Sequence, residues 1–428
     1  MRRRRFIKGA AMALLMSVGG AYALASYDWC GRWPSPPPAL LSVAMAEGTL
    51  LAGAAKVELT PPYPVVVAGY PPLRPEAERA SMPLYARALV LEVEGLSVGV
   101  VVLDALHVPA PLVEEVRART QPLGLSGVWV LATHTHSSFG GFDCHPVAQL
   151  AGTGRCRAEA KKALVHAAAE ALHKAAGTRT AATLSVGEGA ADELVIARSG
   201  DVADGRLTHL VLATTEGGAL AQLVVFSAHP TLVGRRSEAL SPDWPGALAL
   251  AEENAGRGVT LVVQGAGGNA SAANAEEGPA PYARKLGESL AAVGMVQATP
   301  VLLAYAKVGT ALPRPDASRL VPSFSRRAGD NFLCTSAPQE AEVSALRLGP
   351  MSLLAVPGEP TFAAAKQLEQ AAGARRVVGL ANGYLGYVEE AAAVRAAQGE
   401  AKRQYFDPAL TETLTRAAQL AGQAVRLR

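Results

Sequence analysis

The segment from Val128 to Gly141, VWVLATHTHSSFGG, places two histidines directly after a short apolar run. The run 128–132 is predicted to form a buried strand. Alternate side chains of an extended backbone share one face, so His134 and His136 are expected to point the same way at the end of that strand. Two imidazoles beside a glycine-rich turn can begin a metal site, although an isolated pair with this spacing is more often a polar turn. The metal interpretation therefore depends on further ligands from elsewhere in the chain.

Four later strands are predicted to end shortly before a residue that could bind a metal or act in catalysis. Apolar runs at 222–226, 259–263, 351–356 and 377–381 precede His229, Ser271, Glu359 and Tyr387, respectively. Open α/β sheets build their sites beyond the carboxyl ends of their strands. We therefore expect these four residues to converge with His134. The glycine-rich loop before Ser271 lacks the Lys-Ser/Thr ending of a phosphate-binding loop and does not match GxGxxG, so nucleotide binding is not favoured.

Each of these residues has a plain structural alternative. His229 could be a buried histidine with satisfied hydrogen bonds, and Ser271 could cap a helix. Tyr384 competes with Tyr387 as the tyrosine that faces the site. Asp243 could support His229 from behind or serve only in a turn. No single residue establishes a site. The prediction of a site rests on the position that these residues share, just beyond the ends of predicted strands.

Strands and helices alternate along most of the chain, which indicates an α/β fold. Helical spacing is found at 111–120, 159–175, 245–254 and 408–425. The prediction is one catalytic domain over residues 51–428, with a large mixed sheet and helices packed on it. The segment 311–336 is rich in charge and proline and is expected to form surface loop.

The composition is that of a large globular protein. The chain has 428 residues, 50% of them hydrophobic, and a formal net charge of +3. This is enough apolar material for an extensive core. Because the basic residues beyond the amino terminus are scattered, no nucleic-acid partner is expected.

The amino terminus has the composition of a targeting segment. Arginines and an apolar stretch precede Ala25, and RRRFIK fits a twin-arginine export signal. Residues 1–25 are predicted to be either a cleaved signal peptide or a retained membrane anchor. Residues 26–50, which include WPSPPP, are expected to form a Pro-rich spacer. The protein is therefore expected to be periplasmic, secreted or membrane-anchored, and it could associate with a membrane surface.

The four cysteines are Cys30, Cys144, Cys156 and Cys334. In an exported protein they can be oxidised. Cys144 and Cys156 flank a short loop after the two histidines and could clamp it, with free thiols as the alternative. Since no C-x-x-C spacing occurs, metal ligation by cysteine is not expected.

The ordered segments ATHTHS, FSAHPT, QGAGGNAS, VPGEPT and LANGYLGY resemble the catalytic domain of the neutral/alkaline (non-lysosomal) ceramidases. GAAKVELTPP and PLYARALVLE fit the same family, so the resemblance extends from about Ala52 to Tyr405. Asn269 stands where the family usually has an acidic residue. Larger members continue into a C-terminal β-sandwich, which this sequence is expected to lack.

The resemblance implies a zinc ion and a set of catalytic side chains around it. The implied zinc ligands are His134, His229, Glu359 and Tyr387. The implied catalytic residues are Ser271, His136, Arg198 and Tyr405. In this assignment the arginine and Tyr405 hold the amide oxygen, and His136 lies near the attacking group.

The predicted function is zinc-dependent hydrolysis of an N-acyl amide bond, with release of a fatty acid from an N-acylsphingosine or a related lipid amide. The nucleophile is either a water molecule activated at the metal or the Ser271 hydroxyl, and His136 passes the proton to the leaving amine. Two alternatives are kept open. One is hydrolysis of a non-lipid amide or an ester, and the other is a binding protein without turnover, which Asn269 makes conceivable.

Overall fold

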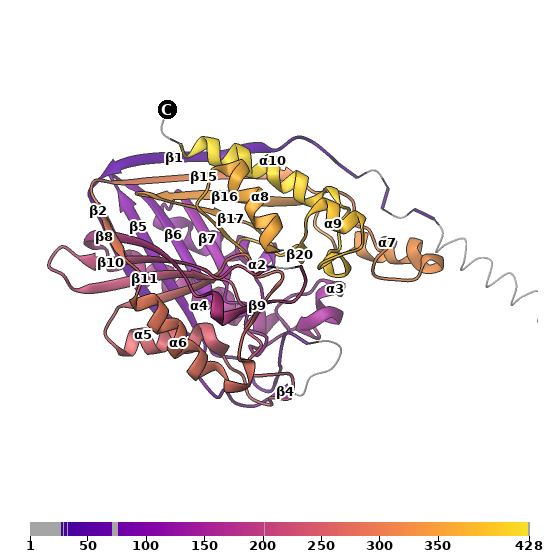
Figure 1. The fold of residues 1–428 in the computed structure, drawn as a ribbon, viewed down its shortest axis with the longest axis horizontal. Coiled ribbons are helices and arrows are strands. Elements are labelled where there is room, and N and C mark those ends of the chain that lie inside the picture. The colour runs from indigo at the N-terminus through magenta and orange to yellow at the C-terminus, as the bar shows by residue number, and fades with distance from the viewer. Residues whose placement is uncertain (1–26, 29, 32, 71–75, 201, 427–428) are drawn as a thin grey trace, which may run out of the picture.

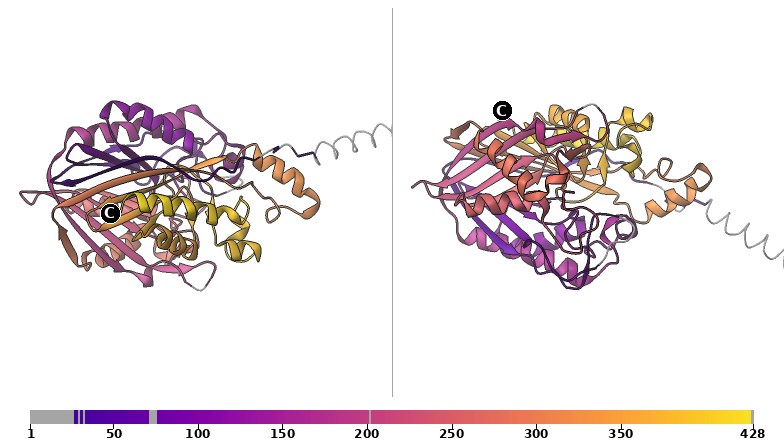
Figure 2. Two further views of the ribbon diagram at one scale, coloured as in Figure 1. Left: turned by 90° about the horizontal axis from the view of Figure 1, so that it is seen from above. Right: turned by 60° about the horizontal axis from the view of Figure 1, so that its bottom comes forward.

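The computed structural model describes residues 27–426, except 29, 32, 71–75 and 201. Two large sheets lie face to face at the centre of the molecule, and helices cover the outer face of each (Figure 1, Figure 2). The result is an αββα sandwich. The predicted α/β class, with a large mixed sheet and packed helices, is confirmed, although the strands form two large sheets where one was expected.

The larger sheet has nine strands and leads to both histidine-bearing loops. Its order is β12-β11-β10-β8-β2-β5-β6-β7, and β14 also pairs with β8. β11 is parallel to β12 and β6 to β7, whereas the other pairs are antiparallel. The strands are β2 (Leu50–Glu58), β5 (Tyr85–Val93), β6 (Leu96–Leu103), β7 (Gly127–Ala132), β8 (Thr180–Ala190), β10 (Arg206–Thr214), β11 (Ala219–Phe226), β12 (Val259–Gln264) and β14 (Met295–Ala298).

The smaller sheet has five strands and leads to the loops that carry Glu359 and Tyr387. Its order is β1-β15-β16-β17-β19, with only the β17–β19 pair parallel. The strands are β1 (Ala39–Gly48), β15 (Val301–Ala311), β16 (Glu340–Leu348), β17 (Met351–Ala355) and β19 (Arg376–Val378). Short two-stranded pairs are formed by β3 (Val65–Val66) with β4 (Glu76–Ala77), β9 (Val195–Ala197) with β13 (Ala270–Ala272), and β18 (Glu359–Pro360) with β20 (Tyr387–Val388).

Helices close the sandwich on both sides. α2 and α4 pack on the larger sheet near β5 and β6, α5 and α6 pack near β11 and β12, and α8 and α10 pack on the smaller sheet. The long helices are α2 (Ala110–Thr120), α4 (Ala158–Gly177), α5 (Asp243–Asn254), α6 (Pro279–Ala291), α8 (Phe362–Ala372) and α10 (Ala409–Ala424). The shorter ones are α3 (Pro146–Ala148), α7 (Arg326–Cys334) and α9 (Ala391–Arg395).

The apolar run of β7 is explained by burial on both faces. Val128 and Val130 belong to the core under α2 and α4, whereas Trp129 and Leu131 belong to the core between the two sheets. A strand covered on both faces reads as a continuous apolar run. Thr133 and His134, the two polar residues after the run, therefore lie directly beyond the carboxyl end of a rigid, buried strand.

Two segments that were expected to be irregular carry regular structure. β1 pairs with β15 along its whole length, so the Pro-rich spacer predicted for 26–50 must end before Ala39. This edge strand was missed because one face is exposed yet apolar, which removes the usual alternation. The predicted surface loop 311–336 is also wrong in part, since it contains α7.

The four cysteines form two disulfides. Cys144–Cys156 closes the loop after the two histidines, as the clamp interpretation predicted, and Cys30–Cys334 joins the segment before β1 to the end of α7. Among the described residues, the helices are too short or too polar to cross a membrane. The signal or anchor predicted for residues 1–25 lies outside the described residues.

Candidate metal centre

The two histidines after β7 are brought together by a sharp change of backbone direction. His134 has a φ of 69°, in the left-handed region, and its amide donates to the carbonyl of Ala105. The Nε2 atoms of His134 and His136 lie 3.4 Å apart, and the two rings meet edge to face. The pair therefore converges, as predicted, but through a turn at His134 rather than through continued extended backbone.

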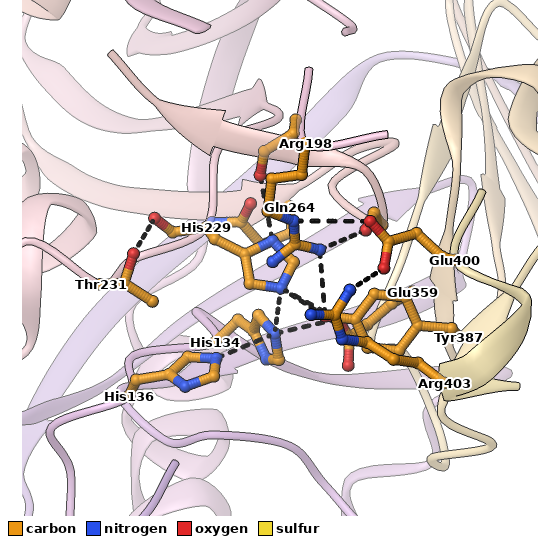
Figure 3. A network of polar contacts seen from close by, with 12 residues as sticks. His134, His136, Arg198, His229, Thr231, Gln264, Glu359, Tyr387, Glu400 and Arg403 are labelled. Atoms are coloured by element: carbon orange, nitrogen blue, oxygen red, sulfur yellow. Dashed lines mark hydrogen bonds and ion pairs between the residues drawn. The ribbon is translucent and has the colours of Figure 1, made fainter. Parts of the chain in front are cut away.

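His229 approaches the same point from the end of β11. Its amide donates to the carbonyl of Ala270 at 3.1 Å, so the neighbouring strand β13 fixes its position. Its Nε2 lies 3.3 Å from Nε2 of His134 (Figure 3). Gln264, at the end of β12, donates to the carbonyl of Thr133 and accepts from the amide of Ala228, so it ties the two histidine-bearing loops together.

The hydrogen bonds of the three imidazoles fix which nitrogen faces the centre. Nδ1 of His134 lies 2.7 Å from the carbonyl oxygen of Leu106, Nδ1 of His229 is 3.1 Å from that of Ala270, and Nδ1 of His136 is 2.9 Å from that of Gly69. A carbonyl only accepts, so each Nδ1 carries the proton and each Nε2 presents a lone pair. Burial lowers the pKa of His229 to about 4 and that of His136 well below its ordinary value, which keeps both rings neutral.

Glu359 completes the cluster from the other sheet. Its Oε2 lies 3.2 Å from Nε2 of His134 and 3.1 Å from Nε2 of His229, and it has no hydrogen-bond donor among the described residues. Lone pairs from three side chains thus meet at a buried point without a proton donor among them, which is the arrangement that a cation stabilises.

The structure separates the roles of the two competing tyrosines. β20 pairs with β18, which sets Tyr387 opposite Glu359, and the Tyr387 hydroxyl lies 3.0 Å from Nε2 of His229. Tyr384 lies behind the carboxylate, where its hydroxyl donates to Oε1 of Glu359 at 2.6 Å. Burial raises the pKa of both phenols. Tyr387 is therefore the tyrosine that can join the ligand set, and Tyr384 orients the carboxylate.

Two arginines and a buried glutamate surround Tyr387. Arg198 donates to the Tyr387 hydroxyl at 3.1 Å, and its guanidinium lies 5.6 Å from the centre of the tyrosine ring. Arg403 lies at the same distance from that ring, and both arginines are ion-paired with Glu400 (Figure 3). Arg198 was predicted as a site residue. Glu400 and Arg403 were not, because they occupy a short charged segment after α9 with no motif of its own.

Ser271 and Tyr405 lie near the cluster without joining its hydrogen bonds. Ser271 forms a β-bridge with His229, but within the described residues its hydroxyl has no hydrogen-bond partner. Tyr405 packs against Gly386, and within the described structure no hydrogen bond joins it to Arg198. Burial raises the pKa of Tyr405 to about 12. The role predicted for Tyr405 stays a prediction, and Arg403 is a further residue that lies with Arg198 over the Tyr387 ring.

Asn269 has a structural role that an acidic residue could not fill. Its amide donates to the carbonyl oxygens of Ser199 and Val202, at 2.9 and 3.0 Å, and its Oδ1 accepts from the amide of Phe362 at 2.9 Å. An aspartate has no N–H to donate to two carbonyls. Asn269 therefore links the Arg198 loop to the start of α8, directly after the Glu359 segment.

Asp243 serves in a turn, which is one of the two roles considered for it. Its carboxylate accepts from the amides of Val233 and Trp244, at 3.0 and 2.7 Å, and the described residues show no contact between it and His229. Burial raises its pKa to about 6. The residue thus folds the loop that follows His229 and does not orient the imidazole directly.

Comparisons with known proteins find structural neighbours but no sequence family. No family model matches the chain, and no curated protein matches by sequence. The crystal structure of neutral ceramidase from Pseudomonas aeruginosa superposes with a TM-score of 0.76 at 18% identity, over 89% of this chain and 76% of that one. A structure described as ceramidase complexed with C2 gives the same TM-score and identity, over 89% and 75%. With its αββα sandwich and its buried histidine cluster, the chain has the fold of the neutral ceramidases.

Proposed function

We propose that the protein is a zinc-dependent amidohydrolase that releases a fatty acid from an N-acylsphingosine or a related lipid amide. The observation that carries the proposal is the convergence of His134, His229 and Glu359 at a buried point, where Oε2 of Glu359 has no donor among the described residues. The ceramidase fold supports the substrate class. Hydrolysis of a non-lipid amide or an ester by the same centre remains the second candidate.

His134, His229, Glu359 and Tyr387 would hold the zinc ion. Two imidazole nitrogens, one carboxylate and one phenol form a set of borderline and hard donors that fits Zn²⁺. Zinc in such a site acts as a Lewis acid on an amide carbonyl and makes water a nucleophile at neutral pH. The buried carbonyls that accept from the Nδ1 atoms orient the imidazoles, and Tyr384 orients the carboxylate.

Other side chains would act on the substrate. His136 is half-buried, whereas His134 and His229 are buried, so it is the imidazole placed to exchange a proton with solvent or with the leaving amine. Arg198 and Arg403 carry donors beside Tyr387, where charge develops on the amide oxygen. The two disulfides among the described residues support the proposed export, since such bonds persist in oxidising compartments.

Removal of zinc tests the proposal directly. We expect the purified protein to contain about one zinc ion per chain and to release fatty acid from N-dodecanoylsphingosine. Dialysis against a chelator should abolish release, and added zinc should restore it. Release from a non-lipid N-acetyl amide, with none from the sphingosine derivative, would favour the second candidate. A protein that binds no zinc would contradict both.

Ser271→Ala distinguishes the two possible nucleophiles. A serine nucleophile needs a base within hydrogen-bond reach, and the Ser271 hydroxyl has no such partner among the described residues. We therefore expect the variant to retain zinc and to lose less than about tenfold in kcat/KM, as attack by water predicts. A loss on the order of 10³-fold with full zinc content would instead assign the attack to Ser271.

A further inference from the structure

Large aromatic side chains lie exposed around α7. Phe324, in the turn that precedes the helix, is 88% exposed, and Phe332, near the end of the helix, is 42% exposed. Tyr27, the first described residue, is 64% exposed. Scattered exposed apolar residues are common on soluble proteins, whereas several large ones in one place indicate contact with another apolar surface. We call Tyr27, Phe324 and Phe332 the α7 surface.

Burial along the last turns of α7 is the reverse of the usual pattern. Asp330 and Asn331 are 9% and 8% exposed, whereas the next residue, Phe332, faces outward. The Asp330 carboxylate accepts from the amide of Ala317 at 2.8 Å, so a polar contact with the body of the protein fixes the orientation of the helix. A helix on a water-exposed surface normally turns its polar residues outward. The outward aromatic face of α7 is therefore held in place by buried polar contacts.

The amino-terminal end of the described chain is fastened to α7. The Asn331 side-chain amide donates to the Tyr27 carbonyl at 2.8 Å, and the Cys30–Cys334 disulfide links the two segments covalently. Tyr27 therefore lies beside the helix that carries Phe332. Figure 1 and Figure 2 show α7 projecting from one end of the molecule, beyond the sheets and the other helices. The α7 surface is thus a single patch at an extremity of the protein.

The sequence before Tyr27 indicates what this patch meets. The apolar stretch that precedes Ala25 has the composition of a segment that enters a bilayer. Tyr27 follows Ala25 by two positions, and two residues of chain reach at most about 7 Å. A bilayer that holds this stretch, during export or as a retained anchor, would therefore have the α7 surface at its own surface.

The ion pairs around α7 leave a small positive surplus. They join four arginines to three aspartates, namely Arg314, Arg319, Arg326, Arg327, Asp28, Asp316 and Asp330. A surplus of one positive charge is compatible with anionic phospholipid but is too small to hold the protein there by attraction alone. Apolar contact by the aromatic side chains would therefore supply most of the binding, while the long arginine side chains keep their charges at the level of the head groups.

We infer that the α7 surface rests on a phospholipid bilayer, with its aromatic side chains at the boundary between the head groups and the acyl chains. Interfacial segments of this kind reach about 5–10 Å into the bilayer. The contact is peripheral, because the helices of the described residues are too short or too polar to cross a membrane. It concerns where the protein docks, and it does not rest on the proposed hydrolysis.

Quenching of tryptophan fluorescence by brominated lipids tests the inference on the full chain. Phe324→Trp adds an indole to the α7 surface, and the control Val296→Trp adds one on β14, where Val296 is 68% exposed. The four native tryptophans give the same background in both variants. With vesicles of brominated phosphatidylcholine and phosphatidylglycerol, we expect the emission added by Phe324→Trp to fall at least about twofold and that added by Val296→Trp to stay unchanged. Phe332→Trp should repeat the result of Phe324→Trp.

Two results would overturn the inference. One is equal quenching of the two added indoles, or quenching of neither. The other is protection of the Phe324→Trp indole from iodide in lipid-free solution, increasing with protein concentration, since a second copy of the chain would then cover the α7 surface. We expect iodide to reach this indole at every protein concentration without lipid and to lose access once vesicles are added. The measurement needs neither zinc nor turnover, so it remains valid if the proposed hydrolysis is absent.

Discussion

Glu359→Gln is expected to remove both zinc binding and amide hydrolysis, with kcat/KM lower than that of the wild type by at least about 10³-fold. The substitution keeps the volume of the side chain, and its Oε1 can still accept from Tyr384. Its new N–H donors would face the lone pairs of His134 and His229, where the carboxylate oxygen now lies at 3.2 and 3.1 Å. The lone pairs of His134 and His229 would then accept hydrogen bonds from the amide that Glu359→Gln introduces, so a cation would no longer be required to stabilise them.

Two further variants serve as controls for the effect of Glu359→Gln. Glu288→Gln makes the same chemical change at an exposed position on α6 and should alter neither zinc content nor rate. Tyr384→Phe removes only the hydrogen bond that orients Glu359, so it should lower zinc affinity by about 10- to 100-fold without abolishing it. Full zinc content and activity in Glu359→Gln would show that the carboxylate is not a ligand.

The positions of the candidate ligands could be predicted because each depends on a local feature. An apolar run that stops before a polar residue marks the end of a buried strand, and this pattern located His134, His229, Glu359 and Tyr387. The structure brings all four together, although they come from two different sheets. The same reasoning failed to find two sheets, because strand partners such as β1 and β15 are 250 or more residues apart and nothing local specifies their pairing.

The residues whose positions the sequence could not fix, or that it missed, lie outside strands. Tyr405 follows a short charged segment after α9, and no sequence rule fixes where such a loop turns. Arg403, two residues earlier, lies over the same Tyr387 ring as Arg198, and no motif in the sequence indicates this. The strand pattern alone did not separate Tyr384 from Tyr387, and the preference for Tyr387 came from the family resemblance, since their positions depend on the pairing of β20 with β18.

Arg376→Met is expected to cause the largest loss of stability of any single change away from the metal centre, about 3–5 kcal/mol. Arg376 is 1% exposed, donates to Asp204 at 2.6 Å and to the carbonyl of Arg206 at 2.7 Å, and approaches the Ser227 hydroxyl at 3.3 Å. Methionine fills a similar volume, but the buried Asp204 carboxylate would then keep only one of its two arginine partners, Arg206. Because Ser227 lies two residues before His229, the variant should also lower the temperature at which zinc is lost.

Arg375→Met is the matched control, because it removes the neighbouring arginine. Arg375 is exposed and pairs with the exposed Glu188 at 3.1 Å, an arrangement worth at most about 1 kcal/mol. Urea denaturation midpoints of the two variants should therefore differ clearly, and equal midpoints would show that the Asp204–Arg376 pair does not hold β19 to the larger sheet. In Arg376→Met, Asp204→Asn added as a second change should recover part of the loss, since the uncompensated charge is then gone. Recovery would attribute the cost to the buried charge, and no recovery would attribute it to lost packing around the guanidinium, which the close approach of Gly265 makes tight.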